Sequence, residues 1–234
     1  MKPLDLLKGV AAGLFVVSLP VLFITTSLRW LVSDVGWYRA GFEKYGVSQT
    51  TGMSSDELAK AADQISRYLL FQRDRVDNIV VNVRGQDVLL FNDREDKHMS
   101  DVRALLGGFY TLQVTSGIYI LLYLASASLW RKRDYWRALG RQLRWGGTLT
   151  VGLFVVFGAA SFLDFDQLFL LFHEVSFSNN YWILDPRVDR LIMMFPDGFW
   201  YDSAIRLALA TGGQAIAAIL VGSLLARKKL AISY

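Results

Sequence analysis

The sequence predicts a mainly α-helical membrane protein, with four transmembrane helices and a small α+β cap on the extracellular side. Three observations support this fold class. Hydrophobic residues make up 53% of the 234 residues, which is more apolar side chain than a soluble core of this size needs. Four apolar runs approach the roughly 20 residues that cross a bilayer as helix, and the chain turns polar between them. The runs cover residues 10–28, 105–130, 149–163 and 204–226.

Basic residues lie beside the ends of these runs and predict the orientation. Lys2 and Lys8 precede the first run, and further lysines and arginines follow the second and the fourth. Basic flanking segments stay on the cytoplasmic side, so we expect both termini in the cytoplasm and residues 33–104 and 164–203 outside. The basic residues after the second and fourth runs are Arg131, Lys132, Arg133, Arg137, Arg141, Arg144, Arg227, Lys228 and Lys229.

The first run allows a second interpretation, a cleaved signal peptide, because a short basic start and an apolar stretch are typical of one. No small-x-small cleavage site follows, and Arg29, Trp30 and Trp37 are typical of an interface anchor. We therefore expect a first transmembrane helix within residues 1–32 and a cap over 33–103. Three further spans and an outer aromatic loop at 164–203 follow within residues 104–234.

The cap carries local signals for one helix and one hairpin. Ser54 and Glu57 form an S-x-x-E capping box ahead of apolar residues at helical spacing, which predicts a helix of about fifteen residues. Two β-rich runs, 78–83 and 87–91, flank residues 84–86 and predict a hairpin. Because a lone hairpin is marginally stable, we expect it to pack on the helix.

A second box starts the helix that leads into the second span. Asn92 and Glu95 form N-x-x-E, and His98 lies on the same helical stripe. His98 is therefore expected just above the outer membrane surface. The polar residues of this start precede the apolar run at 105–130.

The outer segment after the third span is expected to contain a short surface helix. Asp185-Pro186 is a helix-start signal and predicts a helix over residues 186–195 along the bilayer surface. Asp202 or Ser203 is expected to cap the fourth span.

Residues 161–202 are unusually aromatic, with eleven aromatic residues against a chain average of 14%. Aromatic rings with a polar tip settle where apolar and aqueous phases meet. His173 lies in this stretch, on the same side of the membrane as His98. Histidine is the usual acid or base near neutral pH, so two of them meeting there predict a catalytic pair.

Each histidine also has an ordinary structural interpretation. His98 could be a solvated residue at a charged helix start, with Glu95 only capping. His173 could be an interfacial side chain bonded to a carbonyl. The aromatic stretch around His173 favours the functional interpretation of the pair.

Other chemistries fit the residues less well. Glu95 and His98 have the E-x-x-H spacing of di-iron bundles and Glu174 adjoins His173, but such a site needs two motifs and further glutamates. We therefore expect no metal and no cofactor, and no haem because neither histidine lies inside a span. There is no G-x-S-x-G for a serine hydrolase.

The charge and the cysteine count exclude two further classes. The net charge of +4 is small and its basic residues cluster at span ends, so we expect no nucleic-acid partner. The chain has no cysteine, which removes disulfides, thiol nucleophiles and thiolate metal sites.

Several motifs together resemble the bacterial lipoprotein intramolecular transacylases. These are E-x-x-H-M-x-D from Glu95 to Asp101, Phe172-His173, FSNNYWILDP over 177–186 and MFP over 194–196. The resemblance implies a four-helix enzyme of the bacterial plasma membrane with an extracellular cap and catalytic His98 and His173. It covers about 60% of the chain and leaves residues 37–89 unaligned.

The resemblance also implies the reaction. Such enzymes move the sn-2 acyl chain of a diacylglyceryl lipoprotein to the α-amino group of its N-terminal cysteine. This chemistry requires no covalent acyl-enzyme. The expected partners are this lipoprotein and membrane lipid, and the oligomeric state stays open. Substrate contacts are expected from Glu95, Phe177, Asn179, Asn180, Tyr181, Trp182, Asp185 and Phe195.

Two other functions remain open at this stage. One is a non-catalytic membrane protein whose cap binds a lipid or protein partner, which predicts no change in acyl position. The other is metal-dependent lipid hydrolysis, which predicts loss of activity with chelators and release of free fatty acid.

Overall fold

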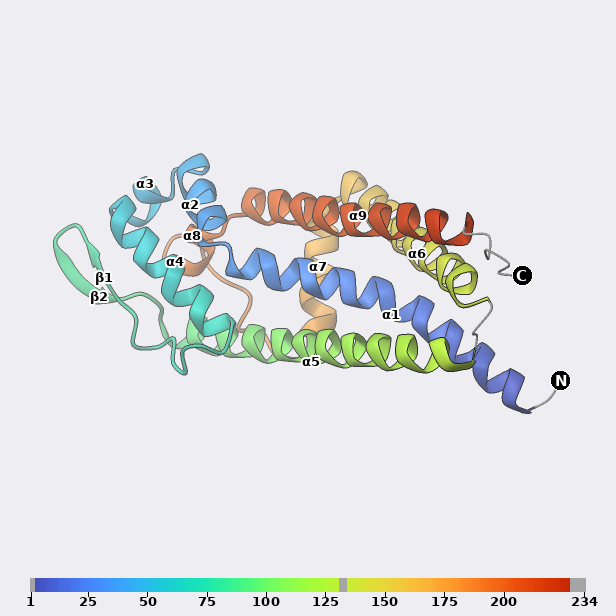
Figure 1. The fold of residues 1–234 in the computed structure, drawn as a ribbon. Helices are drawn as coiled ribbons and strands as arrows, with labels where there is room; N and C mark the ends of the chain where they lie inside the picture. The colour runs from blue at the N-terminus through green and yellow to red at the C-terminus, as the bar shows by residue number, and fades with distance from the viewer. Residues whose placement is uncertain (1–2, 131–133, 228–234) are drawn as a thin grey trace, which may run out of the picture. The chain divides into compact units, whose positions relative to one another are not determined.

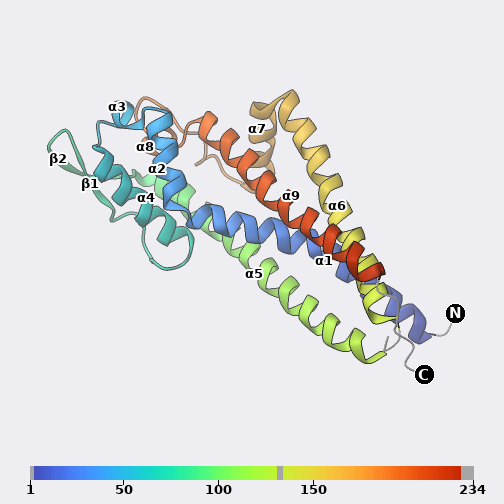
Figure 2. The same cartoon turned by 45° about the horizontal axis from the view of Figure 1, so that its top comes forward.

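The computed structural model describes residues 3–130 and 134–227, apart from the side chains of residues 160–162. The described chain is mainly helical with one two-stranded sheet, as Figure 1 and Figure 2 show from two directions. The predicted mainly α fold with a small β element is therefore confirmed. The elements are α1 (Pro3–Ser33), α2 (Val35–Lys44), α3 (Val47–Thr51), α4 (Ser55–Leu69), β1 (Val80–Val83), β2 (Gln86–Leu89), α5 (Asp93–Trp130), α6 (Tyr135–Leu163), α7 (Phe165–Ser176), α8 (Arg190–Met194) and α9 (Asp197–Arg227).

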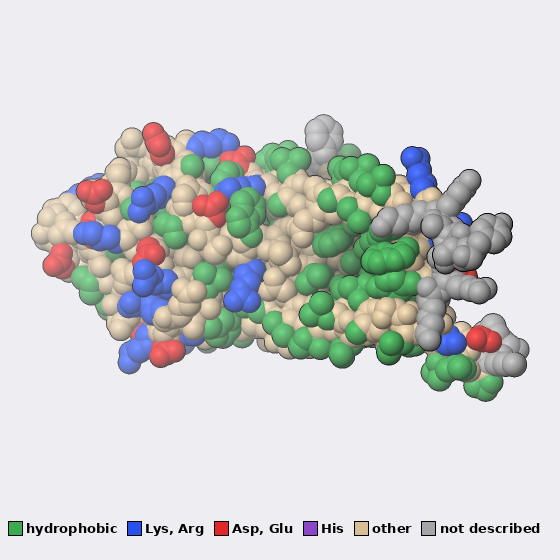
Figure 3. Space-filling model, in the orientation of Figure 1, with side chains coloured by type: hydrophobic (Ala, Val, Ile, Leu, Met, Phe, Trp, Pro, Cys, Tyr) green, Lys and Arg blue, Asp and Glu red, His purple; other side chains and the backbone are tan. Residues whose placement is uncertain are grey.

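Three helices, α1, α5 and α9, are long and apolar enough to cross a membrane. Hydrophobic side chains gather over these helices in Figure 3, whereas charged side chains gather over α2 to α4 and the hairpin. Such exposed apolar stripes are what lipid-facing helices present. Lys2, Lys228, Lys229 and residues 131–133, which the orientation argument uses, lie outside the described residues.

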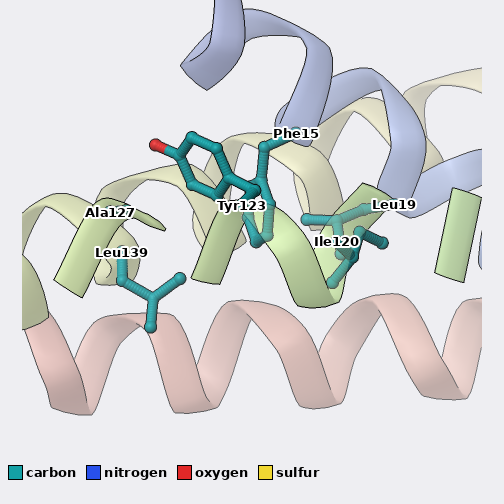
Figure 4. Packing of buried hydrophobic residues seen from close by; sticks show 6 residues of the cluster. All are labelled: Phe15, Leu19, Ile120, Tyr123, Ala127 and Leu139. Carbon is teal, nitrogen blue, oxygen red and sulfur yellow. The ribbon is translucent and has the colours of Figure 1, made fainter. Parts of the chain in front are cut away.

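The chain divides into two compact units, and the first consists of Met1–Ser27, Tyr110–Ala159 and Leu207–Tyr234. Its core contains a buried cluster from α1, α5 and α6, in which the Phe15 and Tyr123 ring centroids are 4.7 Å apart. Figure 4 shows these side chains interdigitating between the helices. The cluster is Phe15, Leu19, Ile120, Tyr123, Ala127 and Leu139.

Two glycines bring α6 and α9 together in this unit. A Cβ atom at Gly140 would lie 2.5 Å from the carbonyl oxygen of Gly222, and one at Gly222 would lie 2.6 Å from that of Gly140. Neither position therefore has room for a side chain. Small residues allow this close backbone approach between membrane helices.

The second unit consists of Leu28–Phe109 and Ala160–Arg206. Its helix α4 has the fifteen residues that the S-x-x-E box predicts, and the Ser54 hydroxyl accepts the Glu57 N–H at 3.2 Å. The predicted apolar face of α4 is buried, which confirms its periodicity. The buried apolar residues are Leu58, Ala61, Ala62, Ile65, Tyr68 and Leu69.

The predicted hairpin is also present, with shorter strands. β1 and β2 pair antiparallel around Arg84 and Gly85, which both have positive φ. This is the backbone of a two-residue type I′ turn, so Gln86 belongs to the strand and not to the turn. Glu57 Oε2 accepts the N–H of Asn82 at 3.0 Å, and this bond ties the hairpin to α4 as expected.

The prediction of a helix over residues 186–195 at the bilayer surface is wrong in its length and in its location. It begins at Arg190 with Asp189 in the cap position, while Asp185 opens a turn and pairs with Arg187. Leu191 and Met194 are buried in the protein, so this segment does not present an apolar face to a bilayer. Proline at the first helical position is compatible with a helix, but here the local signal starts a turn.

The start of the last helix also differs from its prediction. α9 begins at Asp197, five residues before Asp202. The Asp202 carboxylate instead accepts hydrogen bonds from Lys44 and from the Tyr45 hydroxyl. Ser203 accepts the Trp37 indole N–H at 2.9 Å, so both predicted caps are used as tertiary contacts to the α2 segment.

Candidate active site

The two histidines of the chain lie side by side in the second unit. Their ring centroids are 6.0 Å apart with 35° between the ring planes. His98 is 7% exposed and His173 is 8% exposed. The structure thus brings together two imidazoles that lie 75 positions apart in the sequence.

The start of α5 orients His98. Asn92 Oδ1 accepts the N–H groups of Arg94 and Glu95, and Glu95 Oε2 accepts the N–H of Asn92 at 2.8 Å. This reciprocal arrangement is a capping box, as the N-x-x-E motif predicts. It sets the first turn of α5, and His98 follows on the inward face beside buried Met99.

The helix α7, which the sequence did not predict, carries His173. Asp164 caps it by accepting the Gln167 N–H at 3.0 Å. His173 faces inward near its last turn, whereas Leu171 and Val175 are exposed on the opposite side. The amphipathic spacing of α7 therefore turns one imidazole toward α5.

A backbone contact defines the tautomer of His173. Its Nδ1 lies 2.8 Å from the carbonyl oxygen of Phe169, four residues earlier on α7. A carbonyl oxygen only accepts hydrogen bonds, so Nδ1 carries the proton and donates. The second nitrogen, Nε2, is then an unprotonated acceptor.

His98 has no such contact. Its Nδ1 is buried and has no hydrogen-bond partner among the described residues. A buried polar atom left without a partner is costly, so this nitrogen is suited to bind a group of a ligand. His98 lies in the polar start of α5, ahead of the apolar stretch at residues 105–130.

Burial keeps both imidazoles neutral near pH 7. Burial first, and then the neighbouring His173, lower the pKa of His98 to about 4, with Asp101 opposing the change. Burial also lowers the pKa of His173, against the opposing effect of the Phe169 carbonyl. Neutral imidazoles are able to accept a proton at one nitrogen and donate at the other.

Aromatic rings enclose the pair. Phe177 stands edge-on to His98 at 5.1 Å and lies 5.7 Å from His173. Trp182 lies 5.1 Å from His173, and Phe169 lies 4.4 Å from it. Such rings are rigid and apolar, so they shape the site and limit water around the imidazoles.

Phe177 and Trp182 are thus the two predicted substrate contacts that lie against the histidines. Phe169 and Asp101 are neighbours that the predicted residue set lacks. The aromatic density around His173 and the i, i+4 spacing of Phe169 were the available signals for the first. Asp101 ends the E-x-x-H-M-x-D motif three residues after His98, and this spacing was the available signal for the second.

Two predicted polar contacts are engaged in the protein itself. Glu95 is 1% exposed, and its Oε1 accepts the Leu191 N–H at 2.6 Å in addition to the capping contact. Asn179 donates from Nδ2 to Asp101 Oδ2 at 2.9 Å and accepts the Tyr181 N–H at 3.0 Å. Both side chains therefore hold other parts of the protein.

The remaining predicted contacts lie farther out or elsewhere. Asn180 is exposed, Tyr181 is 36% exposed under the Lys97 ammonium, and Asp185 pairs with Arg187. Phe195 is buried in a second aromatic cluster formed with Tyr38, Phe42, Phe199 and Trp200.

The described residues contain no group of three histidine, aspartate or glutamate side chains that could hold a metal ion. Glu174, which adjoins His173 in the sequence, is exposed. A metal site would need several such side chains to converge.

The family model described as lipoprotein intramolecular transacylase Lit matches residues 13–200 of the chain. A curated protein of Aquifex aeolicus (strain VF5), described as an uncharacterized protein, is 32% identical over 121 residues. That alignment covers 51% of this chain and 50% of the relative, so it spans about half the length of that protein.

Solved structures give the same fold. The membrane integral lipoprotein intramolecular transacylase Lit from Bacillus cereus, solved in meso, has a TM-score of 0.79 at 19% identity and covers 94% of this chain and 96% of that one. A variant of the Bacillus cereus protein with one histidine replaced by alanine has a TM-score of 0.74 at 18% identity, covering 94% of each chain.

Proposed function

Because the chain belongs to the lipoprotein intramolecular transacylase Lit family, we propose that it moves the sn-2 acyl chain of a diacylglyceryl lipoprotein to the α-amino group of the N-terminal cysteine. The product is a lyso-form lipoprotein. The observation that carries this proposal is the buried imidazole pair, His98 and His173, with ring centroids 6.0 Å apart. The non-catalytic alternative has no comparable use for two buried, neutral imidazoles.

The proposed location is the bacterial plasma membrane, with four spans and both termini in the cytoplasm. α6 is the fourth spanning helix in this proposal, since it exposes Leu153, Val155, Val156 and Phe157. The basic residues beside the apolar runs support the orientation. The histidine pair then works on the extracellular face.

The reaction exchanges an ester for an amide within one molecule. The amine nitrogen forms a bond to the ester carbonyl carbon, and the bond from that carbon to the glyceryl oxygen breaks. One proton leaves the nitrogen and one arrives at the glyceryl oxygen. The net change is that the acyl group moves from oxygen to nitrogen and a proton moves from nitrogen to oxygen. The attack closes an eight-membered ring, which is unfavourable in open solution.

The histidines have different roles in this proposal. Nε2 of His173 accepts the proton of the attacking amine, because the Phe169 carbonyl holds the other proton at Nδ1. His98 donates a hydrogen bond to the oxygen that gains negative charge. The protonated His173 then supplies the proton to the departing glyceryl oxygen.

Positioning is the larger task. Holding reacting groups together supplies on the order of 7 to 11 kcal/mol of the barrier in well-oriented systems. Phe177 and Trp182 lie against the histidines and act as rigid walls for the folded substrate. Asn180, Tyr181 and Asp185 are the more exposed candidates for contacts to its peptide part.

The test is a diacyl lipopeptide incubated with the purified protein. Transfer leaves the intact mass unchanged, so tandem mass spectrometry must locate the acyl chain, and an amine-reactive reagent must report loss of the free amine. We expect the acyl chain on nitrogen. Release of free fatty acid, or an unchanged acyl position, would contradict the proposal in favour of hydrolysis or binding alone.

The histidine variants test the roles. His98→Ala and His173→Ala are each expected to slow transfer by about 10² to 10⁴-fold, the range of general acid–base catalysis. Gln167→Ala, on the exposed side of α7, is the control and should retain the rate. Transfer that continues when both histidines are alanine would reject the acid–base role.

A further inference from the structure

The segment from Phe177 to Leu191 is fastened along roughly the first three turns of α5. Polar contacts join the two at intervals, and they involve residues on either side of His98. We name this set of contacts the clasp. It comprises Asn179 Nδ2 to Asp101 Oδ2 at 2.9 Å, Arg94 Nη1 to the Ile183 carbonyl at 2.8 Å, Asn92 Nδ2 to Asp189 Oδ1 at 2.7 Å, and the Leu191 N–H to Glu95 Oε1 at 2.6 Å.

The bond between Asn179 and Asp101 is the clasp contact nearest to the imidazoles in sequence. Asp101 follows His98 by three residues on α5, which is one turn along the same face. Asn179 follows Phe177 by two residues, and the Phe177 ring lies against both histidines. This one bond therefore joins the element that carries His98 to the segment that carries the shared aromatic wall.

The Asn179 amide is used at both ends. Its Nδ2 donates to Asp101, and its Oδ1 accepts the N–H of Tyr181 at 3.0 Å. Each end has the partner that its chemistry requires, so the orientation of the amide is defined. Because both ends of the amide are engaged within the chain, the Asn179 side chain connects two segments of the protein, which is a role other than ligand contact.

We propose that Asn179 and Asp101 are positioning residues, whose hydrogen bond holds Phe177 against the imidazoles and so maintains the spacing of His98 and His173. This inference rests on the proposed acyl transfer and assigns to Asn179 a task other than substrate contact. Loss of the bond lets the Phe177 ring move and changes the position of the two imidazoles relative to each other. Small displacements of reacting groups slow such reactions strongly.

A charge exchange tests the bond itself. Asn179→Asp sets two carboxylates against each other, and we expect the maximal transfer rate to fall at least about tenfold, with KM changed less than about threefold. Adding Asp101→Asn restores the hydrogen bond in the reverse direction, because the new amide at 101 donates to the carboxylate at 179. That carboxylate still accepts the N–H of Tyr181. The double variant should return to within about threefold of the wild-type rate.

The hairpin offers a matched control. Asn82 Nδ2 donates to Asp87 Oδ1 at 2.8 Å, and Asn82 Oδ1 accepts the Gly85 N–H at 2.9 Å. This pair repeats the chemistry of Asn179 and Asp101 within the hairpin, which lies between α4 and α5 in the sequence, and its hydrogen bonds involve neither histidine. Asn82→Asp is therefore expected to leave the transfer rate unchanged.

A second readout does not depend on acyl transfer. The chain has two histidines, so carbethoxylation by diethylpyrocarbonate can be assigned by peptide mass. Both rings are buried, and Asn179→Asp should raise their modification rate several-fold while the double variant restores protection. This readout holds even if the wild type transfers no acyl chain, so failure of the clasp and failure of the proposed function are distinguishable.

The opposite outcomes are equally clear. If the double variant remains as slow as Asn179→Asp while both histidines stay protected, Asn179 acts by contacting substrate and the positioning role is rejected. An unaltered rate and unaltered protection in Asn179→Asp also reject it. Thermal unfolding of each variant identifies general destabilisation, which the double variant should correct if the bond is its source.

Discussion

The starts of α4 and α5 carry the same local motif and use it differently. At α4 the Ser54 hydroxyl accepts the Glu57 N–H, but the Glu57 carboxylate turns outward to Lys60 at 2.8 Å and to the Asn82 N–H at 3.0 Å. At α5 the Glu95 carboxylate returns to the Asn92 N–H and also accepts the Leu191 N–H. The glutamate of the α4 motif therefore lies at a solvated edge of the protein, and the glutamate of the α5 motif lies in the interior.

The two carboxylates consequently have opposite electrostatic surroundings. The Glu57 side chain is 19% exposed, and the Lys60 hydrogen bond and then the Asn82 N–H lower its pKa. Glu95 is 1% exposed, and burial raises its pKa although the N–H groups of Leu191 and Asn92 oppose the change. A capping motif therefore specifies where a helix begins, whereas the protein packed around it decides the state of the acid.

The largest expected difference is in catalysis. Glu95→Gln retains one acceptor oxygen for two N–H donors, which loosens the α5 start that carries His98 and the Leu191 contact. We expect transfer to slow by about 10 to 100-fold, while Glu57→Gln changes it by less than about twofold. The rate of N-acylation of a diacyl lipopeptide measures both. Equal effects would show that the α5 box has no special relation to the histidines.

The next largest expected difference between the two capping motifs is in the free energy of unfolding. Glu95→Ala leaves the N–H groups of Asn92 and Leu191 without their acceptors, and each lost contact costs about 1 to 3 kcal/mol when buried. Glu57→Ala removes a more solvated contact, and we expect about 1 kcal/mol. Denaturant unfolding in detergent, followed by tryptophan fluorescence, measures the two losses. A larger loss for Glu57→Ala would reverse the comparison.

The pH dependence should have opposite signs. The lowered pKa of Glu57 means that its contribution to stability is present above 4.5, the unfolded value, and is lost as pH falls through the folded value. The raised pKa of Glu95 means that its ionised form opposes folding above 4.5, and protonation relieves this as pH falls toward 4.5.

Thermal unfolding of each glutamine variant beside the wild type checks this sign. As pH is lowered from 7, the wild type should gain stability relative to Glu95→Gln. Below about pH 4.5 it should lose stability relative to Glu57→Gln. Two differences that move in the same direction would contradict the assignment of opposite surroundings.

The smallest expected effect is that of Lys60. Its side chain is 68% exposed, and it pairs with Glu57 three residues earlier on the helix. Exposed pairs of this kind contribute little to stability, because solvent and salt screen the two charges. Lys60→Ala should therefore shift unfolding only slightly, and less at high salt. A large shift would mean that the Lys60 pair, and not the Asn82 N–H, ties Glu57 in place.

Elements with strong local signals were predictable. The S-x-x-E and N-x-x-E boxes identify the starts of α4 and α5, and the apolar repeat of α4 matches its buried face. The predicted topology, the aromatic stretch and the motif resemblance each indicated His98 and His173 as a candidate pair. These features depend on residues within a few positions of one another or on a specific sequence match, so the sequence alone contains the information.

The short helices were not predictable in the same way. α2 packs Tyr38 and Phe42 against Phe195, which is more than 150 positions away in the chain. α7 begins directly after the apolar run at 149–163, and the acids Asp164 and Asp166 at its start are a short local signal that also fits a turn at the membrane edge. Helices of this length depend on tertiary packing more than on propensity.

By itself the sequence determined where the polar and apolar segments lie, where two helices begin, and that His98 and His173 belong to segments predicted on the same side of the membrane. Only the tertiary structure decided that Glu95 is buried, that Asn179 is engaged with Asp101, and that His98 and His173 meet. Burial and hydrogen-bond partners depend on groups supplied by segments far apart in the chain, as with Glu95 and Leu191, 96 positions apart. No local pattern encodes such a partner.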